Sequence, residues 1–251
     1  MSPTPVATAN QAEPTLSKIE LRITSQQAMP MRFAGQIWIA DAAGSLYWPK
    51  QKLLIVSDCH FEKGSFLKQF ANPIPIYDTL TTISHIAELI LMYEPQHVVC
   101  LGDSFHDTAA GERMLEQDIE SLQSLLQQVS RWTWILGNHD PDIPWQFGGE
   151  RCVSLVIEQI MLAHEPEALA TLQAHHAKAQ VIGHFHPKLS ITRKRHAMHG
   201  KCFMWDDTTL IMPGIGAFTG GLDATEPVLD NIVKKDSRKY ALSYQKKIYT
   251  L

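Results

Sequence analysis

Five short runs of apolar residues in this chain each end abruptly in polar side chains. The first run, residues 54–57, leads directly into Asp58 and His60. Such a run is typical of a buried strand in a parallel sheet. Ligands bind beyond the carboxyl ends of such strands. We therefore expect Asp58 and His60 at the mouth of a sheet, one residue apart on the same side of an extended backbone.

The same pattern recurs four more times along the chain. The later runs end in an Asp, in an Asn-His-Asp group, in a His and in a His-x-His pair, within residues 98–103, 134–140, 160–164 and 181–186. Each polar ending taken singly is also compatible with a solvated strand cap. Carboxylates and imidazoles that lie close together can bind a metal ion. Five endings of this kind therefore indicate one shared site.

Other stretches predict the elements between these strands. Apolar residues at helical spacing predict helices over residues 77–93 and 108–126, and a shorter helix is expected within 166–178. Strands are expected within 18–48 around a turn at 41–45, as a pair at 153–157 and 159–163, and at 202–205, 209–212 and 247–251. Periodicity alone establishes an α/β class. The order of elements further predicts two sheets packed face to face with helices outside.

Length and composition favour one domain with a substantial core. The chain has 251 residues, of which 45% are hydrophobic. Because the five strand ends contribute to one site, we interpret residues 18–251 as a single domain. Residues 1–17 are rich in Pro, Thr, Ala and Gln, so we expect a disordered extension. They have neither the charged nor the apolar region of a signal peptide.

Charge, cysteine spacing and hydrophobicity exclude several classes of protein. The net charge is -4 and the pI is near 6.3, so any contact with nucleic acid must come from a local basic patch. The four cysteines have no zinc-finger or CxxC spacing. No stretch has the length of a membrane span. We expect reduced thiols, no membrane association and a cytoplasmic protein.

The motifs, taken in order, resemble those of the calcineurin-like metallophosphoesterases. That family's pattern is Asp-x-His, Gly-Asp, Gly-Asn-His-Asp, His and Gly-His-x-His, and the match covers roughly residues 54–187. The resemblance implies a four-layer α/β/β/α sandwich with two metal ions at one edge of the sheets. It implies that Asp103 bridges both ions, that the first is also bound by Asp58, His60 and His186, and the second by Asn138, His164 and His184. Imidazole and carboxylate ligands suit Mn, Fe or Zn better than Mg, and we expect Mn²⁺.

Two residues after the Asn ligand are candidates for catalysis. His139 is expected to face the phosphate, where an imidazolium can stabilise charge and protonate the leaving oxygen. Asp140 either orients His139 or caps the segment that follows. His106 either donates to the substrate or belongs to a helix entry, with Asp107 or Thr108 as the N-cap.

A basic run follows the last metal-ligand motif. Arg193, Lys194 and Arg195 stand seven to nine residues after His186. These side chains are either a track for a phosphate backbone or a solvated loop.

Four further stretches resemble the bacterial DNA-ligase-associated metallophosphoesterases more specifically: residues 60–65, 75–79, 102–107 and 213–223. This resemblance spans roughly residues 35–223, with a departure at Gly214 and Ile215, where Ala-Phe is expected. It implies a phosphodiesterase or endonuclease acting on single-stranded or gapped DNA, in a repair set with a DNA ligase, a helicase and an exonuclease-like protein. The alternative substrates are small phosphodiesters, nucleotides or phosphomonoesters. A non-enzymatic scaffold of the same fold ranks lower, because no ligand of the pattern is missing.

Overall fold

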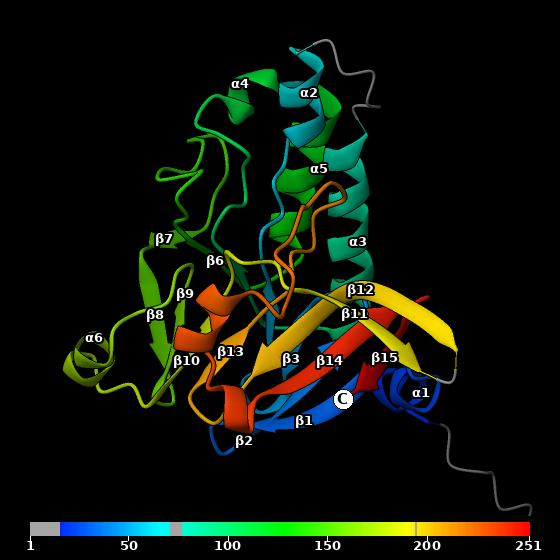
Figure 1. Ribbon diagram of the computed structural model, residues 1–251. Coiled ribbons are helices and arrows are strands. Elements are labelled where there is room, and N and C mark those ends of the chain that lie inside the picture. Colours follow the sequence, from blue (N-terminus) through cyan, green and yellow to red (C-terminus); the bar gives the residue numbers. More distant parts are fainter. Residues whose placement is uncertain (1–15, 71–76, 194) are drawn as a thin grey trace, which may run out of the picture.

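The fold consists of two β-sheets packed face to face, with helices outside (Figure 1). The structure is a computed structural model that describes residues 16–70, 77–193 and 195–251. The first sheet is formed by β1 (Ala28–Phe33), β2 (Gln36–Asp41), β3 (Leu46–Trp48), β4 (Leu53–Val56), β5 (His97–Leu101), β6 (Arg131–Ile135) and β7 (Glu150–Cys152), in that order. Strands β1–β4 pair antiparallel, whereas β4–β7 pair parallel.

The second sheet is built from the C-terminal part of the chain. Its strands are β8 (Ser154–Ile157), β9 (Ile160–Ala163), β10 (Ala179–Ile182), β12 (His196–Trp205), β13 (Thr209–Ile211), β14 (Lys239–Tyr244) and β15 (Lys247–Thr250), and β11 (Lys188–Arg193) pairs with β12. The order across the sheet is β15-β14-β12-β13-β10-β9-β8. Only β10 pairs parallel, with β9 on one side and β13 on the other. Its carboxyl end therefore points the same way as those of its two neighbours.

The helices are α1 (Lys18–Thr24), α2 (Lys63–Lys68), α3 (Asp78–Tyr93), α4 (Ala110–Arg113), α5 (Glu116–Gln127) and α6 (Leu169–Ala174), with short 3₁₀ turns η1 (Pro49–Gln51), η2 (Pro227–Asn231) and η3 (Lys235–Ser237). In Figure 1, α3 and α5 lie together on the outer side of the first sheet. In the described part of the chain, no helix has the length and apolar character needed to cross a membrane.

Strand β4 shows how the layers are held together. All four of its residues are fully buried, and they alternate between two cores. Leu53 and Ile55 pack against the second sheet, whereas Leu54 and Val56 pack beneath α3 and α5. This alternation follows from the two-residue repeat of a strand. It explains why the sequence reads here as a continuous apolar run.

The predicted sandwich of two sheets and outer helices is confirmed, although its fourth layer is thin. The outer face of the second sheet is covered near β12 and β14 by Leu229 of η2 and by Val233. At the other edge it is covered by Leu172 of α6. No long helix lies on this face in the residues that the structure describes.

The prediction of β-structure from residue 18 onward is wrong for its first seven residues, which form α1. A reciprocal capping box begins this helix, with Glu20 N–H donating to Ser17 Oγ and Ser17 N–H donating to Glu20 Oε2. Ile19 and Ile23 then lie on one face and pack on the first core. A capping box and a helical apolar spacing outweigh the β-propensity of the isoleucines here.

Several other boundaries also differ from prediction. The helix expected over 108–126 breaks at Met114 and Leu115 into α4 and α5. Strands β7, β11 and β14 were not predicted, since they are short, polar or far from the motifs. Residues 1–15 lie outside the described part of the chain, so the expected disorder of the N-terminal extension stays a prediction. All four cysteines are free thiols in the structure.

Candidate metal centre

The predicted site residues follow strands of both sheets. Asp58, Asp103 and Asn138 follow β4, β5 and β6 of the first sheet. His164 follows β9, and His184 and His186 follow β10 of the second sheet. Five of these residues form two clusters together with His60. The first cluster contains Asp58, His60 and His186, and the second contains Asp103, His164 and His184. Within each cluster the candidate ligand atoms all lie within 4.8 Å of one another.

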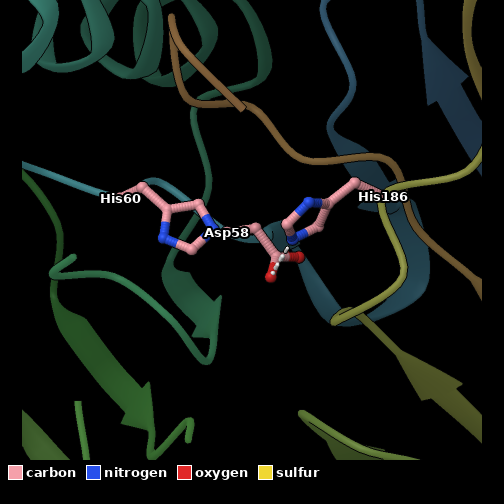
Figure 2. Close-up of side chains that lie close together, drawn as sticks. All are labelled: Asp58, His60 and His186. Carbon is pink, nitrogen blue, oxygen red and sulfur yellow. Dashed lines mark ion pairs between the residues drawn. The ribbon is translucent and has the colours of Figure 1, made fainter. Parts of the chain in front are cut away.

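The first cluster brings Asp58, His60 and His186 around one point (Figure 2). His186 Nε2 lies 2.7 Å from Asp58 Oδ1. The rings of His60 and His186 meet edge to face with centroids 5.2 Å apart. Both ring nitrogens of His60 are buried and have no hydrogen-bond partner among the described residues. A buried imidazole without a partner is costly, and a divalent cation would supply the missing interaction.

The second cluster is organised by Asn138. The amide Oδ1 of Asn138 lies 3.0 Å from His164 Nε2 and 3.1 Å from His184 Nδ1. His164 Nε2 lies 3.3 Å from Asp103 Oδ2. The other nitrogen of this ring, Nδ1, donates to the carbonyl of Leu101 at 3.1 Å. That bond directs Nε2 toward the cluster, as the outer partner of a metal-bound histidine does.

The two clusters adjoin each other. The backbone amide of His184 lies 3.3 and 3.2 Å from the two carboxylate oxygens of Asp58, so a residue of the second cluster contacts a ligand of the first. His164 Nδ1 is 4.0 Å from Asp58 Oδ1. The donors are mixed nitrogen and oxygen atoms, and they fit a pair of divalent transition ions.

Burial and neighbouring charges shift the pKa values of three groups in the clusters. Burial lowers the pKa of His60 to about 3, so its ring is the neutral form that binds metals. Burial also opposes ionisation of Asp103, yet the hydrogen bond and charge of His164 lower the pKa of this carboxyl to about 2. Burial disfavours charge on His164, but its contacts with Asp103 and Asp58 raise its pKa to about 9.

The expectation of an extended backbone at Asp58 and His60 is wrong. Strand β4 ends at Val56, and both residues adopt left-handed φ angles of 54° and 45°. Asp103, His184 and His186 are also left-handed, with φ of 46°, 67° and 43°. Non-glycine residues rarely hold this conformation, which costs roughly 1 kcal/mol or more at each site. The strained backbone positions are thus those that carry candidate metal ligands.

Two glycines make room for Asp103. Gly102 has a φ of 77°, a conformation that glycine adopts readily and that turns the backbone just before Asp103. A Cβ added at Gly137 would come within 2.2 Å of Asp103 Oδ1. Any side chain at position 137 would therefore displace the central carboxylate.

His139 lies beside the second cluster and is partly open to solvent. Its side chain is 43% exposed, and its Nε2 is 4.0 Å from Asp103 Oδ2. Its Nδ1 is 2.9 Å from the carbonyl of His106, which can accept the Nδ1 proton. The ring stacks on that of His106, with centroids 5.4 Å apart and an interplanar angle of 18°. The open nitrogen is therefore Nε2, on the side of the metal clusters.

Asp140 does not orient the ring of His139 in this structure. Its fully buried carboxylate accepts hydrogen bonds from the backbone amides of Gly137 at 3.0 Å, Ser104 at 2.7 Å and Phe105 at 3.0 Å. These bonds join the loop after β5 to the loop after β6. Asp140 thus positions the backbone that carries Asp103 and His139. These bonds match neither predicted role, because they run to Gly137 and to the loop after β5 and not to the segment that follows Asp140.

His106 and Asp107 have separate environments. His106 lies against His60 and His139, with ring centroids 5.6 and 5.4 Å away. Asp107 accepts from the amide of Ala109 at 2.8 Å and pairs with Arg113 at 2.6 Å. Asp107 therefore supports the turn before α4, but the N-cap of this helix is Ala109, so the prediction of Asp107 or Thr108 as the N-cap is wrong. His106 lies at the candidate site.

The basic run lies at the tip of the β11–β12 hairpin. Arg193 is the last residue of β11, and Arg195 is exposed in the turn. Lys194 lies outside the described residues, and so does the side chain of Arg193. A role for these three residues in substrate binding stays a prediction.

Sequence reasoning missed two neighbours of the clusters. Ser57 Oγ donates to Asp58 Oδ2, and Glu165 Oε1 lies 3.7 Å from His184 Nδ1. The only sequence feature that could have found them is their position, each next to a candidate ligand.

Comparison with known proteins agrees with this geometry. Residues 51–167 match the family model of the calcineurin-like phosphoesterases. No curated protein matches the sequence. The crystal structure of the Pseudomonas putida nuclease MPE superimposes with a TM-score of 0.70 at 23% identity, covering 89% of this chain and 100% of that one.

Two more distant structures also match. One is the phosphoesterase Yfce from E. coli, with a TM-score of 0.36 and 14% identity over 79% of this chain and 97% of that one. The other is the protein of unknown function AQ665 from Aquifex aeolicus, with a TM-score of 0.37 and 17% identity over 53% and 78%. At such TM-scores neither adds to the functional argument. Residues 51–167 of this chain are therefore similar to the calcineurin-like phosphoesterases, and the chain shares its fold with the nuclease.

Proposed function

We propose that this enzyme is a two-metal phosphodiesterase that cleaves DNA as an endonuclease, with Mn²⁺ as its metal. The observation that carries the proposal is the pair of adjoining clusters with His139 beside them. Each cluster contains residues that could hold one divalent ion, and Asp103 is the candidate bridge. The structural similarity to a protein described as a nuclease supports a nucleic acid as the substrate, and the finer motif resemblance favours DNA.

When bound, two such ions polarise the phosphoryl oxygens and supply a nucleophile from water near neutral pH. The protein's own contribution begins with His139. With its Nδ1 proton donated to the His106 carbonyl, His139 has Nε2 free to carry a second proton. An imidazolium at this place stabilises charge on the phosphate and donates its Nε2 proton to the leaving oxygen. Asp140 maintains the geometry by joining the two loops that carry Asp103 and His139.

A polymeric substrate suits the exposure of this site. The side chains of His139 and His184 are 43% and 32% exposed, whereas Asp58 and Asp103 beneath them are buried. A phosphodiester in an extended strand can reach such an open centre without being enclosed. Exposed Arg195 in the turn of the β11–β12 hairpin is one group that could contact the backbone of such a strand.

The cellular setting is proposed from the finer motif resemblance. It favours action on single-stranded or gapped DNA in the cytoplasm, in a repair set with a DNA ligase, a helicase and an exonuclease-like protein. Small phosphodiesters, nucleotides and phosphomonoesters are the alternative substrates. A non-enzymatic scaffold is disfavoured, because every metal ligand of the family pattern is present at the clusters.

The experiment is a parallel assay of the purified protein with Mn²⁺, Fe²⁺, Zn²⁺ or EDTA. The substrates are single-stranded, gapped and duplex DNA, bis-p-nitrophenyl phosphate and p-nitrophenyl phosphate. We expect internal cleavage of DNA and of the diester, fastest with Mn²⁺ and absent with EDTA. The double variant Asp103→Asn/His164→Asn controls for contaminating nucleases. Hydrolysis of the small esters with intact DNA would overturn the proposed substrate, and no hydrolysis with any metal would overturn catalysis.

A further inference from the structure

A groove separate from the metal clusters is lined by residues of α1, α3 and the β11–β12 hairpin. Its volume is about 1190 Å³. Pockets for a single small molecule have volumes of about 300–1,000 Å³, so this groove has room for a longer ligand.

One wall of the groove is the polar face of the β11–β12 hairpin. In the register of the two strands Lys188 lies opposite Lys201, and Ser190 lies opposite His199. Residues opposite each other share a face, and side chains alternate along each strand. The other face, which includes Leu189, packs into the outer core of the second sheet. The hairpin therefore presents its polar side to the groove.

The two lysines of this wall have no carboxylate partner. Lys188 Nζ donates to the carbonyl of Thr219 at 3.4 Å, and Lys201 Nζ donates to that of Gly214 at 2.8 Å. Within the described residues neither forms an ion pair, nor does exposed Lys246 at the end of the groove. Like charges opposite each other destabilise a strand pair. Burial and the charge of Lys188 lower the pKa of Lys201 to about 8. An anion in the groove would relieve this repulsion.

The facing wall comes from α3 and mixes polar and apolar side chains. Its residues are Thr81, His85, Glu88, Leu89, Leu91 and Met92, of which Leu91 is 65% exposed. Ile215 continues this surface from the loop after β13. The lysines on one wall suit the phosphates of a nucleic-acid strand, and the imidazole of His85 and the exposed side chain of Leu91 on the other wall can pack against its flat bases.

The groove shares a wall with the metal centre. Ile215 N–H donates to the carbonyl of Ser57 at 2.8 Å, and Gly216 N–H donates to that of Asp58 at 3.2 Å. The loop that lines the groove is thus bonded to the segment that carries a candidate metal ligand. A strand bound in the groove would have its next phosphates close to the clusters.

We propose that this groove binds a single-stranded segment of nucleic acid, with phosphates at Lys188, Lys201 and Lys246 and bases against the α3 wall. This inference rests on the proposed function and deepens it, because it assigns the substrate strand a path beside the metal centre. Arg22 and Lys18 also line the groove, but they are paired with Asp41 and Glu94 and add little net charge.

The test is the affinity of Mn²⁺-loaded protein for a fluorescent phosphorothioate oligo-dT, which resists cleavage, measured by anisotropy over a range of NaCl concentrations. Lys188→Gln/Lys246→Gln should raise the Kd about tenfold and reduce the slope of log K against log salt by about 1.4, since each phosphate contact to a single strand contributes about 0.7. Lys201 is kept because it holds Gly214. The control Lys178→Gln/Lys235→Gln makes the same charge change at exposed sites outside the groove and should bind like the wild type.

A second variant changes only exposed positions, so that folding is not at issue. His85→Glu/Leu91→Glu places negative charge on the α3 wall and should weaken binding at least as much. An unchanged Kd in both double variants would overturn the groove. Displacement of the oligonucleotide by dTMP at equal phosphate concentration would also overturn it, because the site would then bind a free nucleotide.

Photocrosslinking with an oligonucleotide that contains 5-iododeoxyuridine locates the strand directly. Adducts are expected on His85 or Met92, and adducts confined to residues outside the groove would overturn the proposal. The outcomes also separate this inference from the proposed function. Wild-type protein that binds through the groove and cleaves no DNA would overturn the function alone. DNA cleavage with unchanged affinity in both groove variants would overturn the groove alone.

Discussion

The backbone amide of His139 donates a hydrogen bond to Oδ1 of Asp103, at 2.9 Å. One bond thus joins the residue proposed as the acid to the carboxylate proposed as the metal bridge. The second oxygen of Asp103, Oδ2, lies 3.3 Å from His164 Nε2. The carboxylate is therefore held from one side by backbone and presents its other oxygen to the second cluster.

Asp103→Asn should lose most of the bound metal while keeping the fold. The amide oxygen of Asn can still accept from His139 N–H, but the bridging negative charge is gone. Metal content by mass spectrometry, with the melting temperature measured in parallel, checks the prediction. Asp142→Asn, at an exposed position, is the matched control and should retain its metal. Full metal retention in Asp103→Asn would show that Asp103 is not the bridge.

His139→Asn should lower the rate of DNA cleavage by roughly 10²–10⁴, the usual contribution of a positioned acid. Metal content should stay at the wild-type level, because no cluster contains the ring of His139. The rate is measured as kcat on DNA and on bis-p-nitrophenyl phosphate.

The two substrates distinguish the roles of His139. A sugar alkoxide needs protonation as it leaves, whereas p-nitrophenolate hardly does, so an acid matters more for DNA. Equal losses on both substrates would mean that His139 acts only through its charge. Loss of metal in this variant would mean that it is a ligand or a structural support.

His97 should make the protein less stable in mild acid. This residue is the first of β5. It is buried, and its Nε2 lies 2.9 Å from Thr133 Oγ1. Burial, aided by the charge of Arg131, lowers its pKa to about 4. Since the unfolded value is about 6.5, the stability due to neutral His97 is complete above pH 6.5 and is lost as the pH falls toward 4.

Urea unfolding between pH 7 and 4 measures this effect. His97→Gln should show a flatter dependence of the unfolding free energy on pH than the wild type. His175→Gln changes an exposed histidine and should follow the wild-type curve. Parallel curves for wild type and His97→Gln would contradict the prediction.

Tyr93→Phe should destabilise the fold by about 1–3 kcal/mol, because it removes a donor from a buried carboxylate. The hydroxyl of Tyr93, at the end of α3, donates to Asp41 Oδ2 at 2.6 Å, and Asp41 is fully buried. The unfolding free energy in urea measures the loss. Tyr77→Phe is the control, since Tyr77 is 65% exposed. A change below about 0.5 kcal/mol in Tyr93→Phe, the range of ordinary surface substitutions, would contradict the assigned role.

The sequence predicted the parallel strands and the convergence of their polar ends, because both are local consequences of burial. A strand is apolar on both of its faces only when other layers cover both faces of the sheet. Val56 faces one core and Val99 faces the other. The grouping of Asp58 with His186 across 128 positions came from the family resemblance, and the structure brings these residues together. Their roles as metal ligands stay predictions that the variants above will test.

Other features could not be predicted, because they depend on contacts between distant segments. The left-handed backbone of Asp58 and His60 has no local sequence cue, since neither residue is a glycine. The contacts of Asp140 with Ser104 and Phe105 cross 36 and 35 positions of the chain. Helix α1 carried a cue in Ser17 and Glu20, but the nearby β-branched residues obscured it.

The division of the chain between its sheets has a consequence for biosynthesis. The first sheet ends at Cys152 and the second begins at Ser154, and each cluster takes residues from both sides of that boundary. Neither half of the chain contains a complete set of ligands for either ion. A ribosome-bound or truncated polypeptide that has made only the first sheet cannot assemble either candidate cluster. The complete candidate centre therefore forms only when synthesis is nearly finished and the second sheet has docked.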